Sequence, residues 1–217
     1  AEMTNLGLPI PAGFTITTEA CNAYLGGGNS LPDGLWDQVL EAMKAIEGDK
    51  KLGSTENPLL VSVRSGAKFS MPGMMDTVLN LGLNKKTAAA LGALTGNPRF
   101  AMDSLRRLIQ LYAKIVMNVP AELFEDALMD ACASADVAEE TDLTAEQLEG
   151  VADRYREIVR DETGQEFPED PYEQLRLAIT AVFGSWNGRR ARDYRRVNSI
   201  ADDLGTAVNV QVMVFGN

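Results

Sequence analysis

Strand-like segments near both ends of the chain, with a long helical stretch between them, constrain its fold more than any other feature. Residues 13–17 and 59–63 are short and rich in β-branched side chains, and residues 206–215 are rich in Val and partly alternating. From Pro98 to about residue 183 the apolar residues recur at helical spacing. We therefore expect an α+β fold in which the last strand joins the sheet that holds residues 59–63.

Local start and stop signals divide the helical parts. Pro32 and Asp33 open a helix that Gly48 ends. Thr144 and Gln147 form a capping-box pattern before an apolar helical stripe. A further short helix is expected over residues 189–198.

Composition excludes several classes of function. The net charge of −11 argues against general nucleic-acid binding, which requires a basic surface. No apolar run is long enough to span a membrane, and the first residues lack the pattern of a signal peptide. Cys21 and Cys132 lack the spacing of metal ligands, so we expect a reduced cytoplasmic setting and a buried Cys132.

The charges are unevenly distributed. Residues 121–173 hold 18 of the 31 acidic side chains and three basic ones, which is typical of solvated helical faces. Residues 189–196 hold five arginines, which indicate either another solvated face, pairing with the acidic region, or a site for an anion or a partner domain.

The chain contains no histidine. A histidine nucleophile, general base, proton shuttle or metal ligand is therefore excluded within these residues.

The strand at 59–63 runs into Arg64, and a loop rich in Ser, Gly, Pro and Met follows. A guanidinium fixed by a strand can bind phosphate oxygens through two N–H groups, and a turn at Ser65 and Gly66 can add backbone N–H groups in a concave nest. A surface arginine in a turn is the alternative. Asp76, just before Thr77, is interpreted as the cap of a following helix, with metal ligation as the alternative.

Residues 61–82, which include the block Met-Pro-Gly-Met-Met-Asp-Thr at 71–77, closely resemble the nucleotide-binding domain of the pyruvate phosphate dikinases. The block at 71–77 favours this family over its relatives, the phosphoenolpyruvate synthases and glucan water dikinases. Further blocks resemble the family in the same order. They are residues 1–21, 96–110, 182–187 and 205–217.

The resemblance implies one lobe of an ATP-grasp-type domain. Residues 1–95 and 186–217 would form the mixed lobe, and residues 96–185 a helical insertion. It also implies that Arg64 orients the ATP phosphates, with Ser65, Gly66 and Thr77 beside them. Residues 211–214 would form the hinge between lobes, where backbone groups read the adenine edge. The hinge residues are Gln211, Val212, Met213 and Val214.

The resemblance further implies Mg²⁺, with ligands outside this chain, and a phosphohistidine on another domain of the same polypeptide. A phosphate-binding lysine and the second lobe would also lie outside the chain. We therefore expect the parent to convert ATP, pyruvate and phosphate to AMP, phosphoenolpyruvate and pyrophosphate, and the isolated chain to be inactive and prone to self-association.

Arg106 and Arg107 are predicted to lie on the first inserted helix, where one of them could contact phosphate or the carrier domain; pairing with Asp103 is the alternative. Two other functions stay open. One is a standalone acidic helical module that binds a partner, and the other is a sister dikinase such as a phosphoenolpyruvate synthase.

Overall fold

The centre of the molecule is a four-stranded antiparallel sheet with the strand order β1-β6-β4-β5. The computed structural model describes residues 6–69 and 71–215. The first and last strands of the chain are neighbours, and β6 also pairs with β4, so the prediction that the final strand joins the sheet of residues 59–63 is confirmed. The four strands are β1 (Gly13–Ile16), β4 (Val61–Gly66), β5 (Thr77–Leu81) and β6 (Ala207–Val212).

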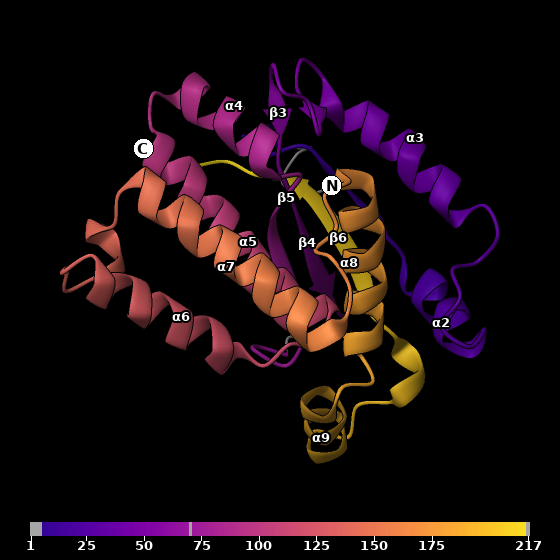
Figure 1. Cartoon of the computed structure of the whole chain (residues 1–217). Coiled ribbons are helices and arrows are strands. Elements are labelled where there is room, and N and C mark those ends of the chain that lie inside the picture. Colours follow the sequence, from indigo (N-terminus) through magenta and orange to yellow (C-terminus); the bar gives the residue numbers. More distant parts are fainter. Residues whose placement is uncertain (1–5, 70, 216–217) are drawn as a thin grey trace.

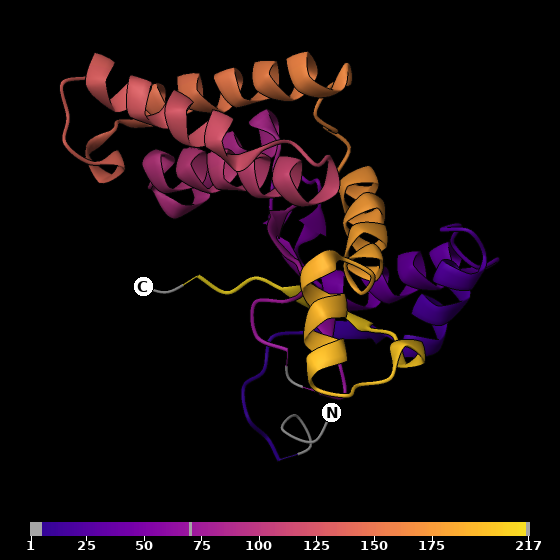
Figure 2. The same ribbon diagram turned by 90° about the horizontal axis from the view of Figure 1, so that it is seen from below.

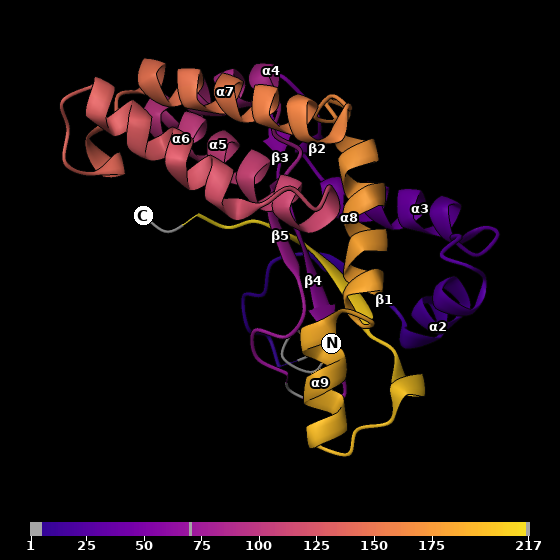
Figure 3. The same cartoon turned by 60° about the horizontal axis from the view of Figure 1, so that its bottom comes forward.

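One face of this sheet forms the core, and α8 (Pro171–Ser185) packs against it (Figures 1 and 3). Alternation along β4 and β6 sends every second side chain to this face. Among the strand residues that point there, five valines are fully buried: Val61, Val63, Val78, Val208 and Val210.

Two helices follow β1. They are α2 (Thr18–Gly26) and α3 (Leu35–Glu47). Tyr24 of α2 packs on Phe183 of α8, with ring centroids 5.4 Å apart. The start predicted at Pro32 and Asp33 is early, because Gly34 has a positive φ of 75° and the helix begins after it. A two-stranded parallel sheet of β2 (Lys51–Leu52) and β3 (Pro58–Leu59) comes next.

The middle of the chain forms a layer of helices that extends away from the sheet (Figure 2). Its members are α4 (Lys85–Thr95), α5 (Pro98–Val116), α6 (Ala121–Ser134) and α7 (Ala145–Thr163), with the 3-10 turn η1 (Glu140–Asp142) between the last two. The capping box of Thr144 and Gln147 at the start of α7 is confirmed. Phe124 and Tyr155 pack edge to face with centroids 4.9 Å apart, and this contact joins α6 to α7.

The proposed division at residues 95 and 185 stays a prediction. Helix α8 belongs by sequence to the expected insertion, yet it packs on the sheet. Helix α4 belongs by sequence to the lobe, yet it packs on α5. The α+β class itself is confirmed.

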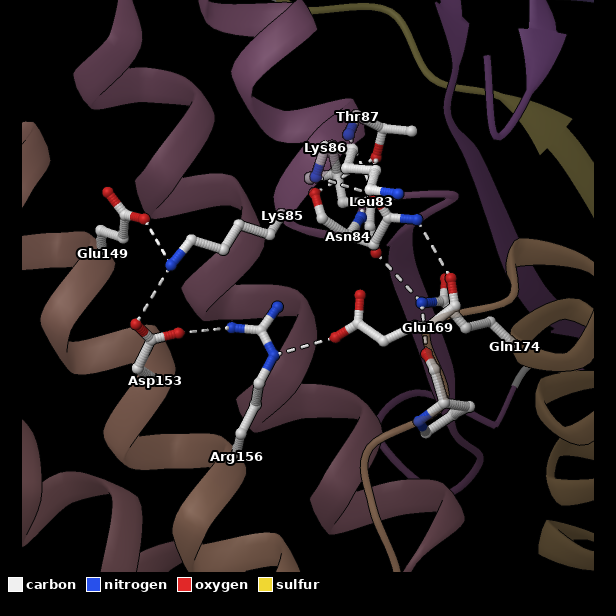
Figure 4. A network of polar contacts seen from close by, with 11 residues as sticks. Leu83, Asn84, Lys85, Lys86, Thr87, Glu149, Asp153, Arg156, Glu169 and Gln174 are labelled. Carbon is white, nitrogen blue, oxygen red and sulfur yellow. Dashed lines mark hydrogen bonds and ion pairs between the residues drawn. The ribbon is translucent and has the colours of Figure 1, made fainter. Parts of the chain in front are cut away.

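A polar network joins the helical layer to the end of β5 (Figure 4). The buried Gln174 side chain accepts a hydrogen bond from the Gly82 N–H (3.1 Å) and donates to the carbonyls of Leu83 (3.0 Å) and Pro168 (2.8 Å). Nearby, Lys85 pairs with Glu149 at 2.7 Å, which links α4 to α7. Gln174 thus joins α8 to the segment between β5 and α4, and the Lys85 pair joins α4 to α7.

The chain ends with α9 (Arg189–Val197), the 3-10 turn η2 (Asp202–Leu204) and β6. Cys21 is buried, whereas Cys132 is half-buried, so the expectation of a buried Cys132 is wrong. No helix among the described residues has the length and hydropathy needed to cross a membrane.

Candidate functional site

A row of polar residues crosses the sheet on the face opposite α8. The strand register places Thr15 of β1 opposite Asn209 of β6, Asn209 opposite Arg64 of β4, and Arg64 opposite Thr77 of β5. Residues that are directly opposite in a sheet point to the same face with Cβ atoms about 5 Å apart. We call this side of the sheet the polar face. Arg64 is at the centre of its row.

Arg64 is exposed, and no hydrogen bond or ion pair joins its side chain to another residue within 6–69 and 71–215. Its backbone is fixed between two neighbouring strands, so the base of the side chain is held in place while the guanidinium at its tip has no partner among the described residues. A planar cation of this kind binds phosphate oxygens through two parallel N–H groups.

Asn209 and Thr15 flank Arg64 on one side, and they were not among the residues predicted from the sequence. The Thr15 hydroxyl donates to Asn209 Oδ1 at 2.7 Å. A Cβ added at Gly66 would lie 2.7 Å from Asn209 Nδ2, so a larger residue here would require this amide to move. The amide nitrogen therefore lies next to the row of Arg64.

Ser65 and Gly66 do not form the predicted turn. They are the last two residues of β4 and pair with Val208 and Ala207. Alternation sends the Ser65 side chain to the core face, away from Arg64, whereas Gly66 lies on the polar face. Thr77 shares the polar face with Arg64.

The predicted hinge residues begin at the end of β6. Gln211 is on the polar face, and its Nε2 donates to the Pro11 carbonyl at 3.2 Å. The backbone N–H groups of Val212 and Met213 already donate to Ala12 and Leu60. Val214 is 70% exposed, and its N–H makes no hydrogen bond among the described residues. Of the hinge residues, Val214 has the N–H that is free to meet a ligand.

The interpretation of Asp76 as a helix cap is wrong, because Asp76 precedes strand β5. Its carboxylate lies 3.5 Å from Arg190 of α9, and burial raises the pKa of Asp76 while Arg190 opposes that shift. The loop before it is held by apolar packing of Met71 on Trp186 and Ala191. The segment that follows Arg64 is thus attached to α9.

The remaining arginine candidates have internal partners. Arg106 is buried and bonds to Asp103 at 2.7 Å, and Arg107 bonds to the same carboxylate at 2.7 Å. Both also reach Glu140, so the alternative of pairing within the protein describes them. Within the cluster at 189–196, Arg195 is buried over the Trp186 ring and bonds to Asp202, and it is not part of a solvated face.

Two surface hollows do not include Arg64, although Thr15 of the polar row lines one of them. One of about 440 Å³ lies between β1, α2 and α3, and another of about 530 Å³ lies between α2, α5 and α8. Arg64 lines neither hollow. No group of three or more Cys, Asp or Glu side chains among the described residues is arranged to hold a metal ion.

Comparison with known proteins defines the class of this domain. Residues 27–217 match the family model described as "Pyruvate phosphate dikinase, AMP/ATP-binding domain", so this part of the chain is a domain of that AMP/ATP-binding family.

The whole chain is 52% identical to pyruvate, phosphate dikinase of Clostridium symbiosum over 220 residues and covers 25% of that protein. It is 52% identical to the Rhizobium meliloti (strain 1021) enzyme, covering 24% of it, and 49% identical to the chloroplastic dikinase 1 of Zea mays, covering 23%. The chain belongs to the pyruvate phosphate dikinase family, and it spans about a quarter of the length of these relatives.

Proposed function

We propose that the chain supplies part of the ATP site of a pyruvate phosphate dikinase. The complete enzyme would convert ATP, pyruvate and inorganic phosphate to AMP, phosphoenolpyruvate and pyrophosphate. Identity near 50% over the whole chain to enzymes of that name supports this activity. The observation that carries the role of this segment is the exposed Arg64 guanidinium, which has no partner among the described residues at the centre of the polar row.

Arg64 would bind the ATP phosphates and neutralise charge on the transferring group. Phosphoryl transfer depends mainly on positioning and on charge stabilisation, and an arginine fixed by a sheet supplies both. Gly66 and Thr77 would lie beside the phosphates. Ser65 would contribute through its backbone, since alternation turns its side chain to the core face.

The segment from Gln211 to Val214 would meet the adenine. With the N–H groups of Val212 and Met213 already bonded, the Val214 N–H is the backbone donor of this segment that can recognise the base edge. The contact of Phe215 with Phe100, at 4.9 Å between centroids, would help to hold the segment in place.

Mg²⁺ would accompany ATP, but the described residues offer no acidic cluster to bind it. We therefore place its ligands in other segments of the polypeptide. The phosphohistidine carrier must also lie elsewhere, because these 217 residues contain no histidine. We expect the isolated chain to lack turnover and to self-associate through surface that other segments cover in the whole enzyme. We expect the whole enzyme to act in pyruvate metabolism in the cytoplasm.

The test is to express the complete polypeptide that contains this chain and to measure phosphoenolpyruvate formation from ATP, pyruvate and Mg²⁺. The proposal predicts that the reaction requires inorganic phosphate and yields pyrophosphate. Formation of phosphoenolpyruvate without added phosphate would indicate a water-accepting sister dikinase instead. Absence of any ATP-dependent reaction would favour a binding or regulatory module.

A further inference from the structure

The polar row offers a second group beside Arg64 whose role the family match does not assign. We propose that Asn209 is a phosphate-binding residue that acts together with Arg64, and that Thr15 and Gly66 position its amide. The inference rests on the proposed function, since it assumes that ATP phosphates bind at Arg64. It extends the phosphate site from β4 and β5 to β6, which carries Asn209, and to β1, which carries Thr15.

The first support is register. Asn209 lies directly opposite Arg64 across the β4–β6 ladder, so the two side chains emerge on the same face about 5 Å apart at Cβ. That spacing allows an amide N–H and a guanidinium to contact different oxygens of one phosphate chain.

The second support is the orientation of the amide. Thr15 Oγ1 donates to Asn209 Oδ1 at 2.7 Å, which uses the acceptor end of the side chain. The donor end remains, and Nδ2 makes no hydrogen bond among the described residues. An amide turned in this way presents two N–H groups on the polar face, which suits an anion.

The third support is the space over Gly66. A methyl group at this position would lie 2.7 Å from Asn209 Nδ2 and 3.6 Å from the Ala207 side chain. The φ of Gly66 is not in the left-handed region, so backbone conformation does not require glycine here. Glycine at position 66 therefore lets the Asn209 amide keep its present position, and a larger residue would move it.

Charge favours this ligand over a cationic one. The row contains one cation, one amide and two hydroxyls, and none of its four residues is acidic. A polyanion would meet donors from three neighbouring strands, whereas a cation would meet an unneutralised guanidinium.

The experiment measures the affinity of the complete polypeptide for ATP and for adenosine by isothermal titration calorimetry. Asn209→Asp keeps the shape of the side chain and replaces its donors with a carboxylate. We expect it to weaken ATP binding about tenfold or more and to leave adenosine binding within about twofold. Asn29→Asp is the matched control, because it adds the same charge at an exposed loop residue outside the sheet.

Two milder variants keep the test decisive if Asn209→Asp does not fold. Gly66→Ala should displace the amide, and Thr15→Val should release it, with a loss of ATP affinity of about two- to fivefold in each case. Thr15→Ser keeps the hydroxyl and should restore wild-type affinity. A merely structural role would change the affinities for ATP and adenosine equally.

Arg64→Ala separates failure of this inference from failure of the proposed function. If Arg64→Ala weakens ATP binding while Asn209→Asp behaves like Asn29→Asp, the role of Asn209 is refuted and the ATP site stands. If Arg64→Ala leaves ATP binding unchanged, the proposed site is refuted, and the inference with it.

Discussion

The helical layer and the polar face of the sheet treat their arginines in opposite ways. In the helical layer, Arg106 and Arg107 share Asp103 and Glu140, and Arg156 bonds to Asp153 and Glu169 (Figure 4). On the polar face, Arg64 has no such partner among the described residues. An arginine is therefore a candidate for binding an anionic ligand when no carboxylate of the fold already neutralises it. A strand position can hold such a cation in place for the ligand.

The largest expected effect comes from removing the unpaired cation. Arg64→Ala in the complete polypeptide should lower the rate of ATP-dependent phosphoenolpyruvate formation by about 10²–10³-fold, as loss of a preorganised donor does elsewhere. Arg64→Lys keeps the charge but not the planar fork and should recover only part of the rate. Steady-state kinetics would measure both. Arg154→Ala, an exposed arginine paired with Glu157, is the control and should change the rate less than twofold.

The second effect concerns the network that joins the two regions. Gln174→Ala would leave the Gly82 N–H and the carbonyls of Leu83 and Pro168 without the side chain that satisfies their hydrogen bonds away from solvent. We expect this loss to lower the free energy of unfolding of the chain by about 3 kcal/mol. Urea unfolding followed by circular dichroism measures it. Gln38→Ala on the exposed side of α3 should cost less than about 0.5 kcal/mol, and equal losses for the two variants would show that the network contributes nothing.

A third prediction concerns an arginine that resembles the paired class although it lies near the loop after Arg64. Arg195→Met would remove the bonds to Asp202 and to the Trp186 carbonyl and the stacking over the Trp186 ring, 4.1 Å from its centroid. We expect the free energy of unfolding, measured by thermal unfolding, to fall by about 2 kcal/mol. Arg196→Met, with its side chain 80% exposed, should leave the unfolding temperature nearly unchanged. An unchanged unfolding temperature for Arg195→Met would show that the contacts of Arg195 contribute no more to stability than those of an exposed residue.

The smallest effect is a dependence of stability on alkaline pH. Burial, followed by a 2.8 Å hydrogen bond to the Glu47 carboxylate, raises the pKa of Tyr172 to about 12. In the unfolded chain a tyrosine titrates near pH 10. The stabilisation is therefore complete below about pH 10 and is lost as the pH rises toward 12. Tyr172→Phe should have a shallower decline of stability over that range, and parallel curves for the two proteins would contradict the assignment.

Sequence reasoning predicted the elements better than their contacts. The Thr144–Gln147 capping box and the joining of the last strand to the sheet follow from local pattern and chain topology, and both are confirmed. The prediction that Asp76 caps a helix was wrong, because an Asp before Thr can equally precede a strand. Here β5 follows it, and the partner of its carboxylate is Arg190 of α9. Arg195 was misread because its burial depends on Trp186, nine residues earlier.

The candidate site was predicted only in part for a related reason. Arg64 stood out through its motif, but Thr15 and Asn209 come from strands about 50 and 145 positions away. Only the register of β1, β6 and β4 brings them into one row, and a shift by one residue would turn every side chain to the other face. The alternation of residues 206–215 gave the faces of β6 without indicating which strand it pairs with.

The most direct test of the ATP site at Arg64 is a crystal structure of the complete polypeptide with Mg²⁺ and a non-hydrolysable ATP analogue. We expect phosphate oxygens about 3 Å from the Arg64 guanidinium on the polar face, with the adenine near Val214. A triphosphate bound elsewhere, for example in the hollow between β1, α2 and α3, with the Arg64 side chain still unpaired, would contradict it.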